Sequence, residues 1–79
     1  MKAEEIEIIV LEVVAKIAKR DPQSLSLENK IAEDLGMKSV SRLELAALLE
    51  DRFPVTIDNF EIRKPKSIAE LVDLIKAKM

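Results

Sequence analysis

The chain has 79 residues, 48% of them hydrophobic and 35% charged, so we expect one self-folding domain over residues 1–79 with a single core. It contains no His and no Cys, which excludes imidazole and thiolate chemistry and argues that the protein is not an enzyme in its own right. Its 13 basic and 15 acidic residues, with two aromatic residues, argue against a nucleic-acid partner, and acidic residues in the first apolar stretch argue against a membrane segment and favour a cytoplasmic protein.

The first element is a predicted helix from Ala3 to Lys19. Its apolar residues recur at spacings of three and four, as in an amphipathic helix: Ile6, Ile9, Val10, Val13, Val14 and Ile17. Glutamates stand in its first half and basic residues at its end, which suits the helix dipole. Asp21 and Pro22 then end the helix, because a residue before proline is restricted away from helical angles.

Residues 21 to 38 form a predicted long loop. Apolar residues at irregular spacing should anchor it to the core: Leu25, Leu27, Ile31 and Leu35. Acidic residues make the loop locally negative, the only glycine, Gly36, stands near its end, and a short helical turn fits Ile31 to Leu35. Loops of this length in small domains tend to be functional.

Ser39 to Phe53 is the clearest predicted helix. Ser41 and Glu44 fit a capping box, and Ser39 is an alternative N-cap. A helical projection predicts a core face made of Leu45, Leu48, Leu49, Arg52 and Phe53. A second face, made of Val40, Glu44, Ala47 and Asp51, is interpreted as a contact surface.

The last part of the chain contains a short element and a final helix. Val55 to Lys66 holds one or two helical turns, with Asp58 or Asn59 as a cap and three apolar anchors: Ile57, Phe60 and Ile62. Ser67 to Lys78 is a predicted helix with Ser67 as its cap and Glu70 three residues later. The sequence therefore predicts an all-α fold.

The segment from Glu33 to Leu45 resembles the modification site of acyl carrier proteins. That family has an acidic loop, Leu-Gly, one or two residues, and then Asp-Ser-Leu at the start of the second helix, followed by Glu-Leu. The matching residues here are Leu35, Gly36, Ser39, Val40, Glu44 and Leu45. The resemblance covers essentially the whole chain and implies a small four-helix bundle of the acyl-carrier type, with three main helices, a short third helix and a long loop between helices one and two.

The resemblance also implies a cofactor and a function. Ser39 would carry 4′-phosphopantetheine, donated by coenzyme A, and the thiol of that arm would explain why the protein needs no Cys. The protein would then be a monomeric carrier that holds acyl intermediates as thioesters for partner enzymes of fatty acid, polyketide or related specialised biosynthesis. Its partners would be a phosphopantetheinyl transferase and enzymes that load, elongate or transfer acyl groups.

Two sets of residues follow from the same resemblance. Partner enzymes would contact the start and one face of the second helix through Lys38, Val40, Arg42, Glu44, Ala47 and Asp51. The acyl chain would be sheltered between the second and third helices by Leu49, Phe53, Ile57, Phe60, Ile62, Ile68 and Leu71. Most of this second set should simply be core.

Two departures from the family pattern keep alternatives open. Lys38 replaces the usual Asp before the serine, and the second helix carries as many basic as acidic residues, which favours a specialised carrier with its own enzymes. A peptidyl, aminoacyl or D-alanyl carrier would share Ser39 and the arm. An unmodified helical interaction module would use Ser39 only as an ordinary helix-start hydroxyl. The basic cluster of Arg63, Lys64 and Lys66 is interpreted as solvated surface.

Overall fold

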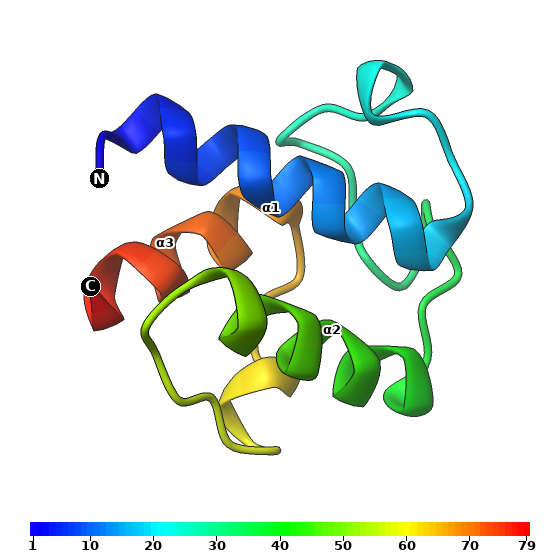
Figure 1. The fold of residues 1–79 in the computed structure, drawn as a ribbon. Helices are drawn as coiled ribbons and strands as arrows, with labels where there is room; N and C mark the ends of the chain where they lie inside the picture. Colours follow the sequence, from blue (N-terminus) through cyan, green and yellow to red (C-terminus); the bar gives the residue numbers. More distant parts are fainter.

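The structure, a computed structural model, describes residues 1–79 and is all-helical (Figure 1). Its elements are α1 (Ala3–Ala18), η1 (Pro22–Ser24), α2 (Ser39–Arg52), η2 (Glu61–Arg63) and α3 (Ile68–Lys78), where η marks a 3₁₀-helix. The all-α prediction and its three main helices are confirmed, and the expected short third helix is the single 3₁₀ turn η2. None of the helices has both the length and the apolarity needed to cross a membrane.

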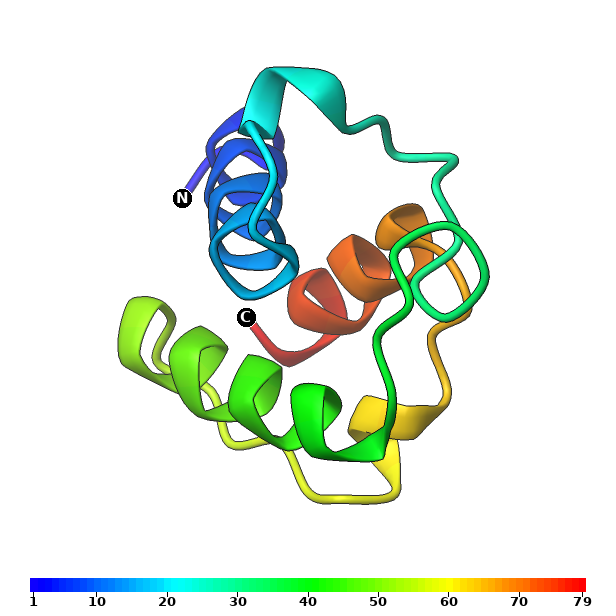
Figure 2. The same ribbon diagram turned by 90° about the vertical axis from the view of Figure 1, so that its right-hand side faces the viewer.

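Helix α1 is the element against which the other two α-helices pack. It runs opposite to α2, and Figure 2 shows α3 beside both of them. Its predicted apolar stripe is largely buried, at Ile6, Val10, Val13 and Val14. The helix ends one residue earlier than expected, because Lys19 takes a left-handed conformation with φ of 59°.

The core is one cluster of 18 buried hydrophobic residues drawn from the helices and the connections between them. The loop contributes Leu25, Ile31 and Met37 to this cluster. Leu27 and Leu35 are partly buried and pack against it, so the predicted anchoring of the loop is confirmed. Arg52, placed on the core face of α2 by helical projection, is instead exposed and forms an ion pair with Glu12 of α1 at 3.2 Å. The position lies in the last turn of α2, where a long polar side chain reaches solvent.

The long loop is tied to the start of α3 by backbone hydrogen bonds. The N–H of Ile31 donates to the carbonyl of Lys66 at 2.9 Å, and Lys30 and Ser67 form an isolated antiparallel bridge. The expected helical turn at Ile31 to Leu35 is present only as hydrogen-bonded turns. These bonds fix the loop that leads directly to Ser39.

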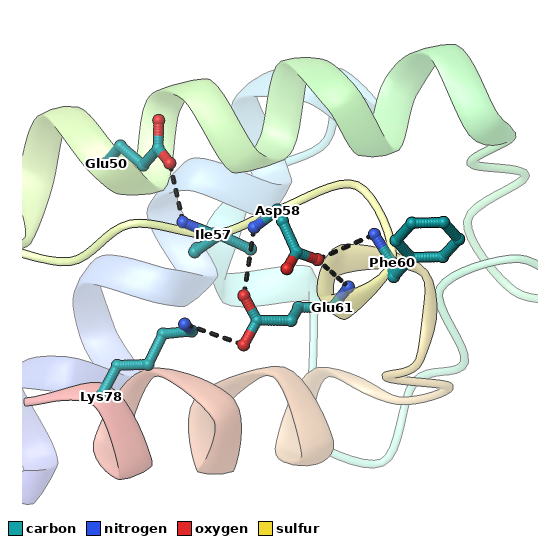
Figure 3. Close-up of polar contacts among 6 residues, drawn as sticks. All are labelled: Glu50, Ile57, Asp58, Phe60, Glu61 and Lys78. Carbon is teal, nitrogen blue, oxygen red and sulfur yellow. Dashed lines mark hydrogen bonds and ion pairs between the residues drawn. The ribbon is translucent and has the colours of Figure 1, made fainter.

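The connection between α2 and α3 is held by side-chain caps (Figure 3). Asp58 Oδ1 accepts from the N–H groups of Phe60 at 2.9 Å and Glu61 at 2.8 Å, so its predicted capping role is confirmed. Glu61 Oε1 accepts from the N–H of Asp58 at 3.1 Å, while Glu61 Oε2 pairs with Lys78 Nζ at 2.8 Å. Glu50 of α2 accepts from the N–H of Ile57 at 2.7 Å.

The prediction that Phe60 is an apolar anchor of the core is wrong. Its side chain is 77% exposed, whereas Ile62 two residues later is fully buried. The Asp58 cap fixes the turn so that Ile62 faces the core and the ring of Phe60 points outward (Figure 3). Phe60 therefore does not help to line the core between α2 and α3.

Candidate functional site

Ser39 is the first residue of α2 and is exposed. The N-cap is Lys38, with extended backbone angles (φ −93°, ψ −176°), and no side chain caps the helix. Both predicted caps are therefore wrong: Ser39 and Ser41 lie inside the helix, because the N–H of Arg42 bonds to the carbonyl of Lys38 at 3.0 Å. The side chain of Ser39 is exposed, and its hydroxyl makes no hydrogen bond with the protein.

Three backbone N–H groups at the start of α2 also have no partner in the protein. They belong to Ser39, Val40 and Ser41, and neither a carbonyl nor a side chain accepts from them. Unpaired N–H groups together with the positive end of the helix dipole favour a bound negative charge. A phosphate esterified to Ser39 suits this position.

A hollow of about 580 Å³ adjoins the serine. Its walls come from the loop before α2, from the start of α2 and from η2: Ala32, Gly36, Met37, Lys38, Ser39, Arg42 and Arg63. Three of these seven residues are basic and none is acidic. The environment of Ser39 is therefore positively charged, although the whole chain has a net charge of −2.

The loop that leads into the site turns at Gly36. Its φ of 65° lies in the left-handed region, which glycine adopts without a steric penalty. Its N–H donates to the carbonyl of Ala32 at 3.0 Å, and the next residue, Met37, is buried. This turn fixes the approach of the chain to Lys38 and so sets where α2 begins.

Arg42 is not an exposed partner contact, as the sequence predicted, but a buried structural residue. It is only 8% exposed, and its Nη1 donates to the carbonyls of Ile62 at 2.9 Å and Pro65 at 2.6 Å. These bonds tie the start of α2 to the η2 region. Burial lowers the pKa of the Arg42 guanidinium from its ordinary value, because desolvation penalises the charged form.

Comparison with known proteins identifies the family to which this site belongs. Residues 9–75 match the family model described as the phosphopantetheine attachment site. The chain is 42% identical over 67 residues to the acyl carrier protein of Campylobacter concisus, covering 85% of this chain and 87% of the relative. The acyl carrier protein of Thermosynechococcus vestitus is 34% identical over 79 residues, covering 100% of this chain and 98% of the relative.

The chain belongs to the acyl carrier protein family. Its cofactor is 4′-phosphopantetheine, whose thiol supplies the group that the protein itself lacks. Family members are carriers rather than catalysts, and they interact with a phosphopantetheinyl transferase and with acyl-handling enzymes. The free hydroxyl of Ser39, the unpaired N–H groups and the basic hollow fit this cofactor.

The other residues expected on the partner-binding face of the carrier lie at its surface. Val40 is 70% exposed, and Glu44, Ala47 and Asp51 are exposed along the same side of α2. With Arg42 inside and Arg52 paired with Glu12, the free charges on this side of the helix are acidic. The basic departure from the family pattern is thus concentrated at Lys38, beside the serine.

The residues expected to shelter an acyl chain are core residues, with Phe60 as the exception. Those that are buried are Leu49, Phe53, Ile57, Ile62, Ile68 and Leu71. None of the three hollows of the carrier is lined by any of them. An acyl chain would have to part these side chains in order to enter between α2 and α3.

Arg63 is the site residue that the sequence did not identify. It was interpreted as part of a solvated basic cluster, yet it lines the hollow beside Ser39. Its neighbours Lys64 and Lys66 do not line that hollow. No local pattern distinguishes the three residues, because the difference arises from the way η2 packs against α2.

Proposed function

We propose that Ser39 is the residue of this carrier that receives the phosphopantetheine arm. The observation that carries the proposal is the free hydroxyl of Ser39 at the uncapped start of α2, inside the matched region 9–75. In the loading step, Ser39 Oγ forms the new bond to phosphorus and loses its proton, while the nucleotide part of coenzyme A leaves. Once attached, the arm offers a thiol that holds cargo as a thioester.

Intact mass after incubation with coenzyme A, Mg²⁺ and a broad-specificity phosphopantetheinyl transferase tests this assignment. The parent should gain one phosphopantetheine, and Ser39→Ala should gain none. Ser41→Ala is the matched control, because it removes a second hydroxyl two residues away in the same helical turn and should load like the parent. Loading of Ser39→Ala, or loss of loading in Ser41→Ala alone, would contradict the assignment.

The proposed cargo is an acyl intermediate of fatty acid, polyketide or related specialised biosynthesis. The acidic side of α2 is the proposed contact surface for partner enzymes, with Val40, Glu44, Ala47 and Asp51 exposed on it. Reaction specificity then lies in the partners, and the carrier acts by tethering rather than by catalysis. The short turn η2 takes the place of the third helix in this proposed four-helix arrangement.

The charge-reversed Lys38 favours a carrier with dedicated partners, because charge complementarity mainly sets encounter rate and specificity. Arg42 is bonded to the carbonyl of Ile62 and Arg52 is paired with Glu12, so Lys38 is the basic residue left to set this preference. The single domain and the monomeric, cytoplasmic state stay predictions. A peptidyl or D-alanyl carrier would load in the same way, whereas an unmodified interaction module would gain no mass.

A further inference from the structure

Basic side chains are concentrated around the hollow beside Ser39. Of the 13 basic residues of the chain, three line it, and none of the 15 acidic residues does so. Lys38, Arg42 and Arg63 take part in none of the four ion pairs of the structure. The hollow therefore holds three positive charges with no carboxylate to balance them.

Two acidic residues of the adjacent loop, Glu33 and Asp34, have partners outside the hollow. Asp34 Oδ2 accepts from the N–H of Lys30 at 2.8 Å, and Glu33 pairs with the side chain of Lys30 at 3.5 Å. Neither residue lines the hollow. These two carboxylates therefore do not pair with the cations beside the serine.

The lack of a counter-charge in the hollow is unfavourable chiefly because one of its three cations, Arg42, is buried. Its side chain is more than nine-tenths buried, and its Nη1 donates only to the neutral carbonyls of Ile62 and Pro65. A buried charge without an opposite charge is unfavourable, and nearby cations add repulsion. An anion held in the hollow would relieve both effects.

We propose that Lys38 and Arg63, which line the same hollow as the buried charge of Arg42, form a binding site for the phosphate of the arm esterified to Ser39. The site holds the base of the arm between the start of α2 and η2, so that loading stabilises the folded protein. This inference rests on Ser39 being the attachment residue. It gives the reversed charge at Lys38 a role within the carrier itself.

Thermal unfolding of the apo and loaded forms of the full chain tests the inference, with loading of every variant checked by intact mass. The Tm of the parent should rise by about 4 °C on loading. Lys38→Gln and Arg63→Gln should each lose at least half of that rise. Lys66→Gln makes the same charge change outside the hollow and should keep it. In 1 M salt the rise in the parent should shrink, because salt screens exposed charges.

The sign of the change in the apo form separates phosphate binding from a structural role. Removing one of several like charges should leave the apo Tm unchanged or slightly higher, whereas removing a structural residue would lower the Tm of both forms. Equal rises on loading in the parent, Lys38→Gln and Arg63→Gln would overturn the inference and leave the attachment at Ser39 standing. A parent that gains no mass would overturn the attachment, and the inference with it.

Inorganic phosphate added to the apo protein separates the two sources of phosphate. The inference predicts a smaller rise in Tm than loading produces, because the attached phosphate is held at a high effective concentration. An equal rise with millimolar inorganic phosphate would assign the hollow to free anions. That result would overturn a site dedicated to the arm.

Discussion

Two helices of this carrier begin beside the same dipeptide, Lys38-Ser39 at α2 and Lys66-Ser67 at α3, and the two serines have different roles. Ser67 is the N-cap of α3, and its Oγ accepts from the N–H of Glu70 at 3.2 Å. Ser39 lies one position further into its helix and accepts nothing. The same two residues therefore build a closed helix start in one place and an open one in the other.

The loop between α1 and α2 causes this difference. It supplies carbonyls to α3, where the N–H of Ile68 donates to Asn29 at 3.1 Å and the N–H of Ala69 donates to Leu27 at 2.8 Å. With the Ser67 side chain and backbone accepting the next two, all four N-terminal N–H groups of α3 are paired. No segment does this for α2, so three of its N–H groups stay available to a ligand. An open helix start is thus a local property that the surrounding chain permits.

The residue three positions after the serine is Arg42 in α2 and Glu70 in α3. The largest expected loss of stability comes from substituting Arg42. Arg42→Met should destabilise the apo protein by about 2–4 kcal/mol, because the carbonyls of Ile62 and Pro65 would lose their donor in a buried place. Urea unfolding measures the loss. Arg52→Met is the matched control on the same helix, and its exposed pair with Glu12 should be worth at most about 1 kcal/mol. Equal losses in the two variants would show that Arg42 does not hold η2 against α2.

The contrast between Arg42 and Glu70 also shows how far the sequence could predict the structure. The Ser67 cap was predictable because the serine and Glu70, whose N–H it accepts from, lie only three positions apart in the sequence. The inward orientation of Arg42 was not predictable, because its acceptors lie 20 and 23 residues away, in a segment for which the sequence predicts one or two helical turns. Local patterns fix helices and caps, whereas a polar side chain that serves a distant backbone leaves no local pattern.

The same reasoning applies to the site itself. Ser39 could be found because its neighbours match a family motif, but the position of Ser39 within α2 depends on the turn at Gly36 and the burial of Met37. Arg63 could not be assigned, because its place beside Ser39 depends on how η2 folds back. Phe60 was misplaced for a related reason: apolar character alone does not say which side of a capped turn a residue faces.

Alanine at the two serines tests the comparison most directly. Ser67→Ala should cost the apo protein about 1 kcal/mol, because the N–H of Glu70 loses its acceptor. Ser39→Ala should change the stability by less than about 0.5 kcal/mol, because its hydroxyl has no partner. Urea unfolding of both variants beside the parent measures the difference. A loss for Ser39→Ala as large as that for Ser67→Ala would mean that the hydroxyl of Ser39 already serves the fold.

The smallest expected effect is the acid sensitivity of the ion pair between Glu61 and Lys78, here called the clip, which joins η2 to the end of α3. The hydrogen bond from Lys78, and then that from the backbone of Asp58, lower the pKa of Glu61 from its ordinary value of 4.5. Since the folded state favours the ionised form, the contribution of Glu61 is present above about pH 4.5 and is lost as the pH falls through the lowered pKa. Glu61→Gln should therefore have a lower unfolding midpoint than the parent at pH 7. The two midpoints should converge in acid, where Glu61 of the parent becomes protonated.

Lys78→Met is the companion variant for this measurement, since it removes the donor that lowers the pKa of Glu61 most. It should flatten the same part of the pH profile as Glu61→Gln. A parent profile that both variants reproduce would show that the clip contributes nothing to stability. Because η2 carries Arg63 and presents the carbonyl of Ile62 to Arg42, loosening the clip should also weaken the rise in Tm on loading. Phosphate binding at the open start of α2 would then depend on a contact at the far end of α3, whereas the closed start of α3 depends only on its own serine and the loop beside it.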